Sequence, residues 1–359
     1  MKIIHCADLH LDSKMESVLT SQKARERKNE ILMTFLRMVE YARKNWVSAI
    51  IIAGDFFDTE NVSLKVQNLI LDAIRQNPGI SFLYLRGNHD CENFLYTMPD
   101  PPENLFFFAE EWTKYDFADV SICGVELTKE NSSTIYESLQ LESRKKNIVV
   151  LHGEVVPDTS MPGELISLKK LAGHDIDYLA LGHLHTYKEG TLDERGVYVY
   201  SGCLDGRGFD ECGEKGFSLI EINEGVLTHH FVPMSSRILR HQIVDVSNCE
   251  NTAQMLKKVQ DALISVDSSD LVKITFVGDL SLDCEKNLDL VNQYLEQNYY
   301  FGRCKDLTKT VVPVEEYRYD PTLRGEFIRQ VLAAAIPEDQ KASILHMGLA
   351  ALAGEDFDS

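Results

Sequence analysis

Short apolar runs that end in polar, turn-forming residues recur through the first half of the chain. Five of them span residues 2–7, 49–53, 81–85, 147–151 and 177–181. Most are rich in Ile, Val, Leu or Tyr, and runs of four to six such residues are typical of buried strands. Amphipathic patterns at helical spacing fill two of the intervals between them. We therefore predict an α/β fold.

The two helical patterns cover residues 21–45 and 62–76. In each, apolar residues recur at the three- and four-residue spacing of one helix face, with charged residues between them. The stripe of residues 62–76 could pack on the sheet or face a second subunit. From Val197 to Val232, short alternating runs separated by Gly turns predict a second sheet.

The pattern changes twice in the last third of the chain. From about Ser235 we expect a small α/β module with strands at 240–246, 271–277 and 299–304 and helices at 250–264 and 285–298. After Pro313, apolar residues mark two amphipathic helices on either side of Pro337. This hairpin could dock on its own protein, or it could bind a groove or coiled coil of a partner.

Five polar motifs stand at the ends of the predicted strands. They are Asp8-Leu9-His10, Gly54-Asp55-Phe56-Phe57-Asp58, Gly87-Asn88-His89-Asp90, His152-Gly153 and Gly182-His183-Leu184-His185. Each motif alone is also found in ordinary turns, but together they offer seven oxygen or imidazole donors and no thiolate. Such a set suits pairs of manganese, iron or zinc ions and is typical of two-metal phosphoester hydrolases. Because ligand sites gather at the carboxyl ends of strands, we expect the donors to meet at one rim.

The ordered motifs resemble the calcineurin-like metallophosphoesterase superfamily and, within it, the SbcD-type DNA repair exonucleases. Residues 7–13 and 206–216 look closest to the YhaO-like bacterial branch. The resemblance implies a four-layer sandwich of two mixed sheets flanked by helices, with a small α/β capping domain and C-terminal helices. The expected domains are a dimetal phosphoesterase domain (1–235), a capping domain (236–312) and a C-terminal helical partner-binding segment (313–359).

The resemblance also implies roles for the motif residues. One ion would be held by Asp8, His10, Asp55 and His185, and the other by Asp55, Asn88, His152 and His183, with Asp55 bridging. His89 would protonate or stabilise the leaving oxygen, Asp90 could orient His89, and Asp58 would support the site from behind. The expected cofactor is a pair of Mn²⁺ ions, with Fe²⁺, Zn²⁺ or Mg²⁺ as alternatives.

The implied function is a metal-dependent DNA phosphodiesterase, an exonuclease or endonuclease of DNA repair. Its implied partners are DNA and an SbcC-like or YhaN-like coiled-coil ATPase bound through the C-terminal helices. Such proteins commonly form homodimers near residues 62–76, but the proline-rich segment Tyr96–Pro102 departs from their second dimer helix, so the homodimer stays open.

The net charge of the chain argues against a nuclease that binds DNA without a partner. At a formal charge of −20, the protein is poorly suited to grip DNA alone, because phosphate contacts need basic side chains. Either a partner supplies much of the DNA contact or the substrate is small. The alternative function is therefore a small-molecule or protein phosphoesterase that uses the same dimetal core without an ATPase.

Several features bear on the compartment. No run approaches the roughly 20 apolar residues that a membrane-spanning helix needs. A strand begins by residue 2, which leaves no room for a signal peptide. The eight cysteines show no C-x-x-C spacing and are expected as free thiols. We expect a cytoplasmic protein that does not engage membranes.

Overall fold

The computed structural model describes residues 1–13, 19–58, 62–90, 93–156, 165–281, 284–311 and 319–353. The chain divides into two compact units, Met1–Ile238 and Leu239–Ser359. The three domains expected from the sequence stay a prediction. Residues 312–318 and 354–359, which belong to the expected third domain, lie outside the described residues.

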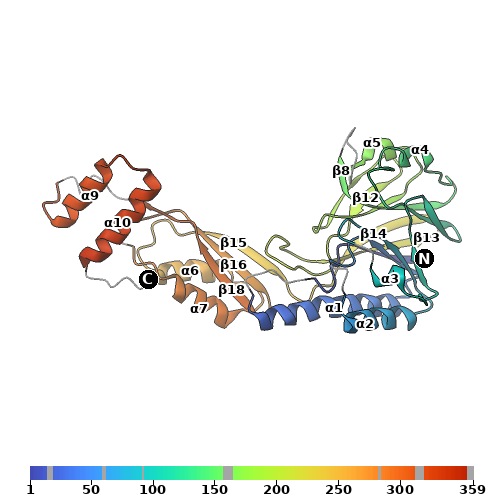
Figure 1. Ribbon diagram of the computed structural model, residues 1–359, viewed down its shortest axis with the longest axis horizontal. Helices are drawn as coiled ribbons and strands as arrows, with labels where there is room; N and C mark the ends of the chain where they lie inside the picture. Colours follow the sequence, from blue (N-terminus) through green and yellow to red (C-terminus); the bar gives the residue numbers. More distant parts are fainter. Residues whose placement is uncertain are drawn as a thin grey trace. The chain divides into compact units, whose positions relative to one another are not determined.

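Two six-stranded mixed sheets form the first unit, and Figure 1 shows them with the helices of this unit. The first sheet has the order β14-β13-β1-β2-β3-β4, with β14 (Val226–Pro233), β13 (Gly216–Asn223), β1 (Lys2–Cys6), β2 (Ala49–Ala53), β3 (Ser81–Leu85) and β4 (Leu105–Phe107). The second has the order β11-β12-β10-β7-β6-β5, with β11 (Lys188–Thr191), β12 (Val197–Tyr200), β10 (Tyr178–Gly182), β7 (Lys146–His152), β6 (Val120–Gly124) and β5 (Thr113–Phe117). In both sheets the central strands are parallel, and antiparallel pairs occur toward the edges.

Three apolar cores separate four layers in this unit. One core joins the first sheet to α1 (Ser21–Lys44) and α2 (Leu64–Arg75) through residues such as Phe35, Ile50 and Ile70. A second lies between the sheets and includes Ile51 of β2 and Val150 of β7. The third joins the second sheet to α4 (Ile135–Ser138) and α5 (Leu168–Leu171). The expected sandwich is confirmed, and the apolar stripe of α2 lies on the chain's own sheet.

One expectation about the sheets is wrong. The runs from Val197 to Val232 do not build a separate second sheet. Only β12 belongs to the second sheet, whereas β13 and β14 return to the first, where β13 pairs antiparallel with β1. The second sheet is instead centred on the parallel strands β7 and β10. Both sheets therefore contribute strands whose carboxyl ends carry the motifs.

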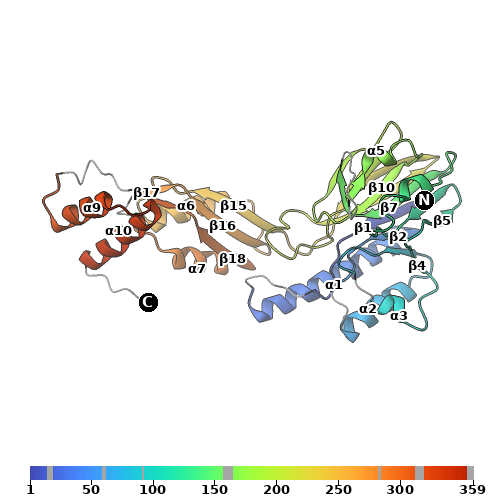
Figure 2. The ribbon, with the colours of Figure 1, turned by 45° about the horizontal axis from the view of Figure 1, so that its top comes forward.

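The second unit contains a three-stranded parallel sheet, β15 (Leu239–Asp245), β16 (Leu271–Val277) and β18 (Phe301–Asp306), whose strands lie side by side in Figure 2. Helices α6 (Thr252–Ala262) and α7 (Leu288–Asn298) cover one face, and Met255, Val291 and Ile274 belong to the apolar core between the helices and the sheet. Strands β17 (Asp279–Ser281) and β19 (Lys309–Val311) form a short second sheet.

Two helices, α9 (Leu323–Ala333) and α10 (Glu338–Ala353), end the described chain and pack on one another through Ile328, Val331 and Leu345. The break between them falls at the expected Pro337. Within the described residues, every helix is too short or too polar to cross a bilayer.

Candidate metal centre

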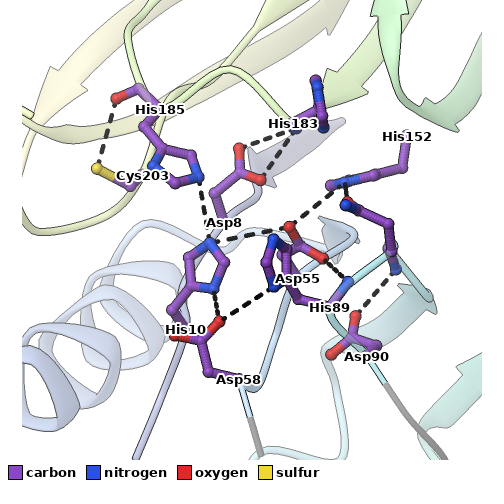
Figure 3. A network of polar contacts seen from close by, with 12 residues as sticks. Asp8, His10, Asp55, Asp58, His89, Asp90, His152, His183, His185 and Cys203 are labelled. Atoms are coloured by element: carbon purple, nitrogen blue, oxygen red, sulfur yellow. Dashed lines mark hydrogen bonds and ion pairs between the residues drawn. The ribbon is translucent and has the colours of Figure 1, made fainter. Parts of the chain in front are cut away.

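The ends of five strands supply the side chains of the candidate metal centre, shown in Figure 3. In the first sheet, Asp8 follows β1, Asp55 follows β2 and Asn88 follows β3. In the second, His152 is the last residue of β7 and His185 follows β10. The motifs therefore meet where the carboxyl ends of two sheets come together, rather than along one sheet.

The backbone bends sharply at the centre. Asp8, His10, Asp55 and His183 have φ values of 52°, 45°, 51° and 104°, in the left-handed region. This conformation costs a non-glycine residue on the order of 1–3 kcal/mol. Two main-chain hydrogen bonds hold it: Asp8 N donates to Gly54 O (3.0 Å) and His10 N to Asp55 O (2.9 Å). The loops after β1 and β2 are thereby fixed against each other.

A first cluster of metal-binding atoms comes from Asp8, His10 and His185, whose ligand atoms all lie within 4.8 Å of one another. The Nε2 atoms of His10 and His185 are 3.2 Å apart, and the two rings point toward each other in Figure 3. Asp55 Oδ2 lies 3.8 Å from His10 Nε2. The structure thus brings together the four side chains expected around one ion.

A second cluster comes from Asp8, Asp55 and His152. His152 Nε2 lies 3.4 Å from Asp55 Oδ2 and 3.0 Å from Asn88 Oδ1. Because Asp55 approaches both His10 and His152, its carboxylate lies between the two clusters, where a bridging ligand would be needed. Asp8 belongs to both clusters, although the family resemblance implied that it holds one ion.

Among the described residues that could bind metal, His183 is an expected ligand whose side chain belongs to neither cluster. Its ring packs edge-on against His152, with centroids 5.5 Å apart. Its backbone N–H donates to both carboxylate oxygens of Asp8, at 2.9 and 3.1 Å. In this geometry His183 fixes Asp8 through the main chain, and its role as a ligand stays a prediction.

The hydrogen bonds of three imidazoles test whether the centre suits metal ions. Each ring gives its Nδ1–H to an acceptor outside the centre: His10 to Asp58, His185 to Glu211 (2.6 Å) and His152 to the Ala53 carbonyl (2.9 Å). In the neutral ring that metal ligation requires, these acceptors assign the proton to Nδ1, so each Nε2 would turn a lone pair toward the centre. Two such lone pairs face each other across the 3.2 Å between His10 and His185. A divalent cation satisfies this arrangement of imidazole and carboxylate donors.

A second layer of charged residues lies behind His10 and His185. Asp58, expected from the sequence as a support, accepts from His10, and the buried Glu211 accepts from His185. Arg207 donates to both carboxylates, at 2.8 Å to Asp58 and 2.9 Å to Glu211. Burial opposes the charge of Glu211, but the hydrogen bond from His185 and the charge of Arg207 lower its pKa to about 2. The sequence marked Arg207 and Glu211 only as part of a family segment and missed this role.

The neighbours His89 and Asp90 have different surroundings. The His89 side chain is 58% exposed, and its Nδ1 lies 3.9 Å from Asp58 Oδ1. Asp90 is buried and accepts N–H groups from Phe57 (2.9 Å) and Gly87 (3.0 Å), so it ties the loop after β2 to the loop after β3. The Asp90 oxygens accept from the backbone, and Asp58 Oδ1 lies 3.9 Å from His89 Nδ1. The expected role of Asp90 in orienting His89 stays a prediction.

Two glycines allow the ligands to approach the main chain closely. Gly54 has a φ of 94°, and a Cβ there would meet the His152 ring, with Cγ at 2.6 Å. A Cβ on Gly87 would meet Asp55 N at 2.6 Å and His152 Cε1 at 2.8 Å. Real Cβ atoms essentially never come that close, so a residue with a side chain at either position would clash with the proposed ligands.

Charges within the centre are strongly coupled. Burial opposes ionisation of Asp55, but its hydrogen bond to His152 and the charge of that ring hold the pKa of Asp55 well below its usual range. Burial lowers the pKa of His152, yet Asp55 and Asp8 overcome it and raise that pKa to about 9. Burial dominates at Asp8 and raises its pKa. A bound cation competes with the proton that these groups share, because metal ligation requires a neutral imidazole.

Residues 1–187 match the family described as calcineurin-like phosphoesterase. The chain is 27% identical over 277 residues to the uncharacterised metallophosphoesterase YhaO of Bacillus subtilis, covering 73% of this chain and 67% of YhaO. It is 28% identical over 295 residues to the DNA double-strand break repair protein Mre11 of Saccharolobus solfataricus, covering 75% of this chain and 72% of that protein. A dimetal phosphatase from Danio rerio aligns in structure with a TM-score of 0.44 and 12% identity, over 64% of this chain and 95% of the phosphatase.

Proposed function

This chain belongs to the calcineurin-like phosphoesterase family, and from that premise we propose that it is a two-metal phosphodiesterase acting on DNA. The observation that carries the chemistry is the pair of donor clusters that share Asp8 and Asp55. Support for DNA comes from the similarity to Mre11. That similarity covers 75% of the chain, more residues than the first unit holds, so it continues past the catalytic unit.

Each side chain of the centre has a task in this proposal. When bound, the ion pair would activate water and stabilise charge on the phosphoryl oxygens. Asp55 would hold both ions. Asp8, His10 and His185 would hold one of them, and His152 and His183 the other. Asn88 would add a neutral amide oxygen, which raises the coordination number without placing another negative charge beside a phosphate.

His89 is proposed as the group that serves the leaving oxygen. Its ring is exposed beside the centre and takes no part in either donor cluster, so it is free to meet a substrate. Asp58 Oδ1 lies 3.9 Å from its Nδ1 and would help to orient the ring, which would donate a proton to the leaving oxygen. This assignment makes His89 the catalytic residue and gives Asp90 a role in holding loops.

A basic sheet face in the second unit supports contact with DNA. In β16 and β18, Val272, Ile274 and Cys304 point toward the helices, so Lys273, Arg303 and Lys305 lie on the opposite face. Lys273 stands opposite Arg303 in the register. Within the described part of the chain, no carboxylate forms an ion pair with these three cations. Cations gathered on one face suit a phosphate backbone, although the chain as a whole is acidic.

The C-terminal helices are proposed to bind a coiled-coil ATPase of the SbcC-like or YhaN-like kind. Their mutual packing leaves apolar side chains at the surface, with Met347 52% and Leu352 45% exposed. Phe327, Ile344, Met347 and Gly348 line a shallow apolar groove on this pair. An exposed apolar helix face suits a helical partner. The ATPase would then add further DNA contacts to a chain whose net charge is −20.

The test uses purified protein with Mn²⁺ and end-labelled duplex and single-stranded DNA. We expect metal-dependent cleavage that Asp55→Asn abolishes. The triple variant Lys273→Glu/Arg303→Glu/Lys305→Glu should lose DNA affinity while hydrolysing bis(p-nitrophenyl) phosphate at the wild-type rate. Intact DNA, together with rapid hydrolysis of small phosphoesters, would contradict the DNA assignment.

A second experiment addresses the partner. Removing residues 314–359 should leave hydrolysis of a small phosphodiester unchanged, because every proposed ligand precedes residue 186. The same deletion should abolish co-purification with the ATPase. If the shortened protein misfolds or loses the small-substrate activity, the helices belong to its own core and the partner proposal is wrong.

The alternative function is a small-molecule or protein phosphoesterase without an ATPase. The net charge of −20 favours it, since an acidic surface repels DNA. The two functions share the metal centre and differ in the substrate. Comparing DNA with phosphorylated small molecules and peptides, at equal enzyme and Mn²⁺ concentration, separates them.

A further inference from the structure

We propose that Arg207 is a positioning residue that joins the supports of His10 and His185, so that both imidazoles face the same metal ion. The inference rests on the dimetal centre of the proposed function and does not depend on DNA as the substrate. It concerns one ion only, because the His152 side of the centre is held by a main-chain carbonyl instead.

Arg207 contacts two carboxylates through separate N–H groups. Its Nη1 donates to Asp58 Oδ2 at 2.8 Å, and its Nη2 and Nε donate to Glu211 Oε1 at 2.9 and 3.2 Å. Its backbone N–H donates to the other oxygen, Glu211 Oε2, at 2.6 Å. The remaining oxygen of Asp58 and the same Oε1 of Glu211 accept from His10 and His185. One guanidinium thus fixes the orientation of both rings.

The loop that carries Arg207 is itself anchored to the sandwich. Arg27 of α1, only 1% exposed, donates to Asp205 Oδ1 and to Gly206 O, both at 2.8 Å. The buried Lys215 donates to the His185 carbonyl at 2.7 Å. Arg207 is therefore held between rigid elements, as a positioning group must be.

Two effects of Arg207 on metal binding have opposite signs. As a nearby positive charge, it repels a divalent cation, and its removal alone would tighten binding. As a clamp, it keeps two Nε2 atoms aimed at one point, and its removal would weaken binding. Loss of such an outer hydrogen-bond partner typically costs about 10–100-fold in metal affinity. The direction in which the Mn²⁺ affinity changes when Arg207 is replaced therefore shows whether its charge or its positioning role dominates.

The experiment measures Mn²⁺ binding to metal-free protein by isothermal titration calorimetry. Wild type should bind two ions, and Arg207→Met should bind one of them about 10–100-fold more weakly while the other is unaffected. The Mn²⁺ affinity of Arg207→Lys should lie between those of wild type and Arg207→Met, because an ammonium group keeps the charge but cannot bond both carboxylates at once as a guanidinium does. The matched control is Arg195→Met: Arg195 also joins two carboxylates, Asp175 and Asp177, at 2.9 and 2.8 Å, but neither of them supports a proposed ligand.

Electron paramagnetic resonance of Mn²⁺ supplies a second readout that does not depend on turnover. At an ion concentration that gives the spectrum of a coupled pair in wild type and Arg195→Met, Arg207→Met should show the six-line spectrum of an isolated ion. In a Glu211→Gln background, Arg207→Met should lower the Mn²⁺ affinity by a smaller factor than it does in wild type. The reason is that Arg207 acts on His185 through the Glu211 carboxylate, which this background has already removed.

Each other outcome overturns a definite claim. Unchanged or tighter Mn²⁺ binding by Arg207→Met, in protein that melts at the wild-type temperature without metal, refutes the positioning role. A raised KM with unchanged metal affinity would make Arg207 a substrate contact instead. If wild type itself binds fewer than two ions, the dimetal centre of the proposed function fails, whatever Arg207 does.

Discussion

Gly87→Ala places one methyl group against the carboxylate that is proposed to bridge the ions. A Cβ at this position would lie 2.6 Å from Asp55 N and 2.8 Å from His152 Cε1, and closer still to Asp55 Oδ1. Ordinary contacts begin at 3.4 Å. The Asp55 backbone must therefore withdraw by roughly 0.8 Å, and its Oδ1 by more. Gly87 has no left-handed φ, so alanine adds no backbone strain and the effect comes from displacement alone.

A displacement near 1 Å at a reacting centre can cost about 100-fold in rate. We expect Gly87→Ala to lower kcat/KM for bis(p-nitrophenyl) phosphate with Mn²⁺ by about that factor and to weaken metal binding. The control is Gly79→Ala, where a Cβ meets nothing within 4 Å. It should retain wild-type activity. If Gly87→Ala also retains activity within threefold, Asp55 does not lie where the structure places it, and its bridging role loses its geometric basis.

Three further variants test separate parts of the account. Asp55→Asn should abolish Mn²⁺-dependent hydrolysis because both ions lose a ligand; retention of both ions and full activity would remove the bridge. His89→Ala should keep its metal content and lose roughly 10²–10⁴-fold in kcat, more for a poor leaving group than for nitrophenolate; equal losses on the two substrates would leave His89 only a positioning role. Arg27→Met should destabilise the first unit by about 3–5 kcal/mol in urea unfolding, since Asp205 would stay buried without its cation. A change below about 1 kcal/mol would mean that the hydrogen bonds from the Thr34 hydroxyl and the Ser236 N–H are enough to stabilise the buried Asp205 carboxylate.

Much of the fold follows from local patterns. The helical stripe of residues 21–45 became α1 (Ser21–Lys44), with the Thr20 hydroxyl accepting from Lys23 N at its start. The stripe of residues 62–76 became α2 (Leu64–Arg75). Apolar runs before each motif became β1, β2, β3, β7 and β10, and the family resemblance is confirmed. Periodicity and burial fix such elements without knowledge of distant partners.

The parts that were missed depend on pairing between distant segments. The sequence could not place β13 beside β1, because a strand pattern does not say which sheet it joins. It could not place Glu211 behind His185 or Arg207 between two carboxylates, since irregular loops carry no periodic signal. It could not show that the buried carboxylate of Asp90 accepts the backbone N–H groups of Phe57 and Gly87.

The central claim is that two metal ions share Asp55 at the junction of the two sheets. Anomalous diffraction from crystals loaded with Mn²⁺ tests it directly. The account predicts two peaks about 3.5–4 Å apart, one in contact with His10 and His185, the other with Asn88 and His152, and both with Asp55. A single peak, or two peaks that do not share Asp55, would contradict it.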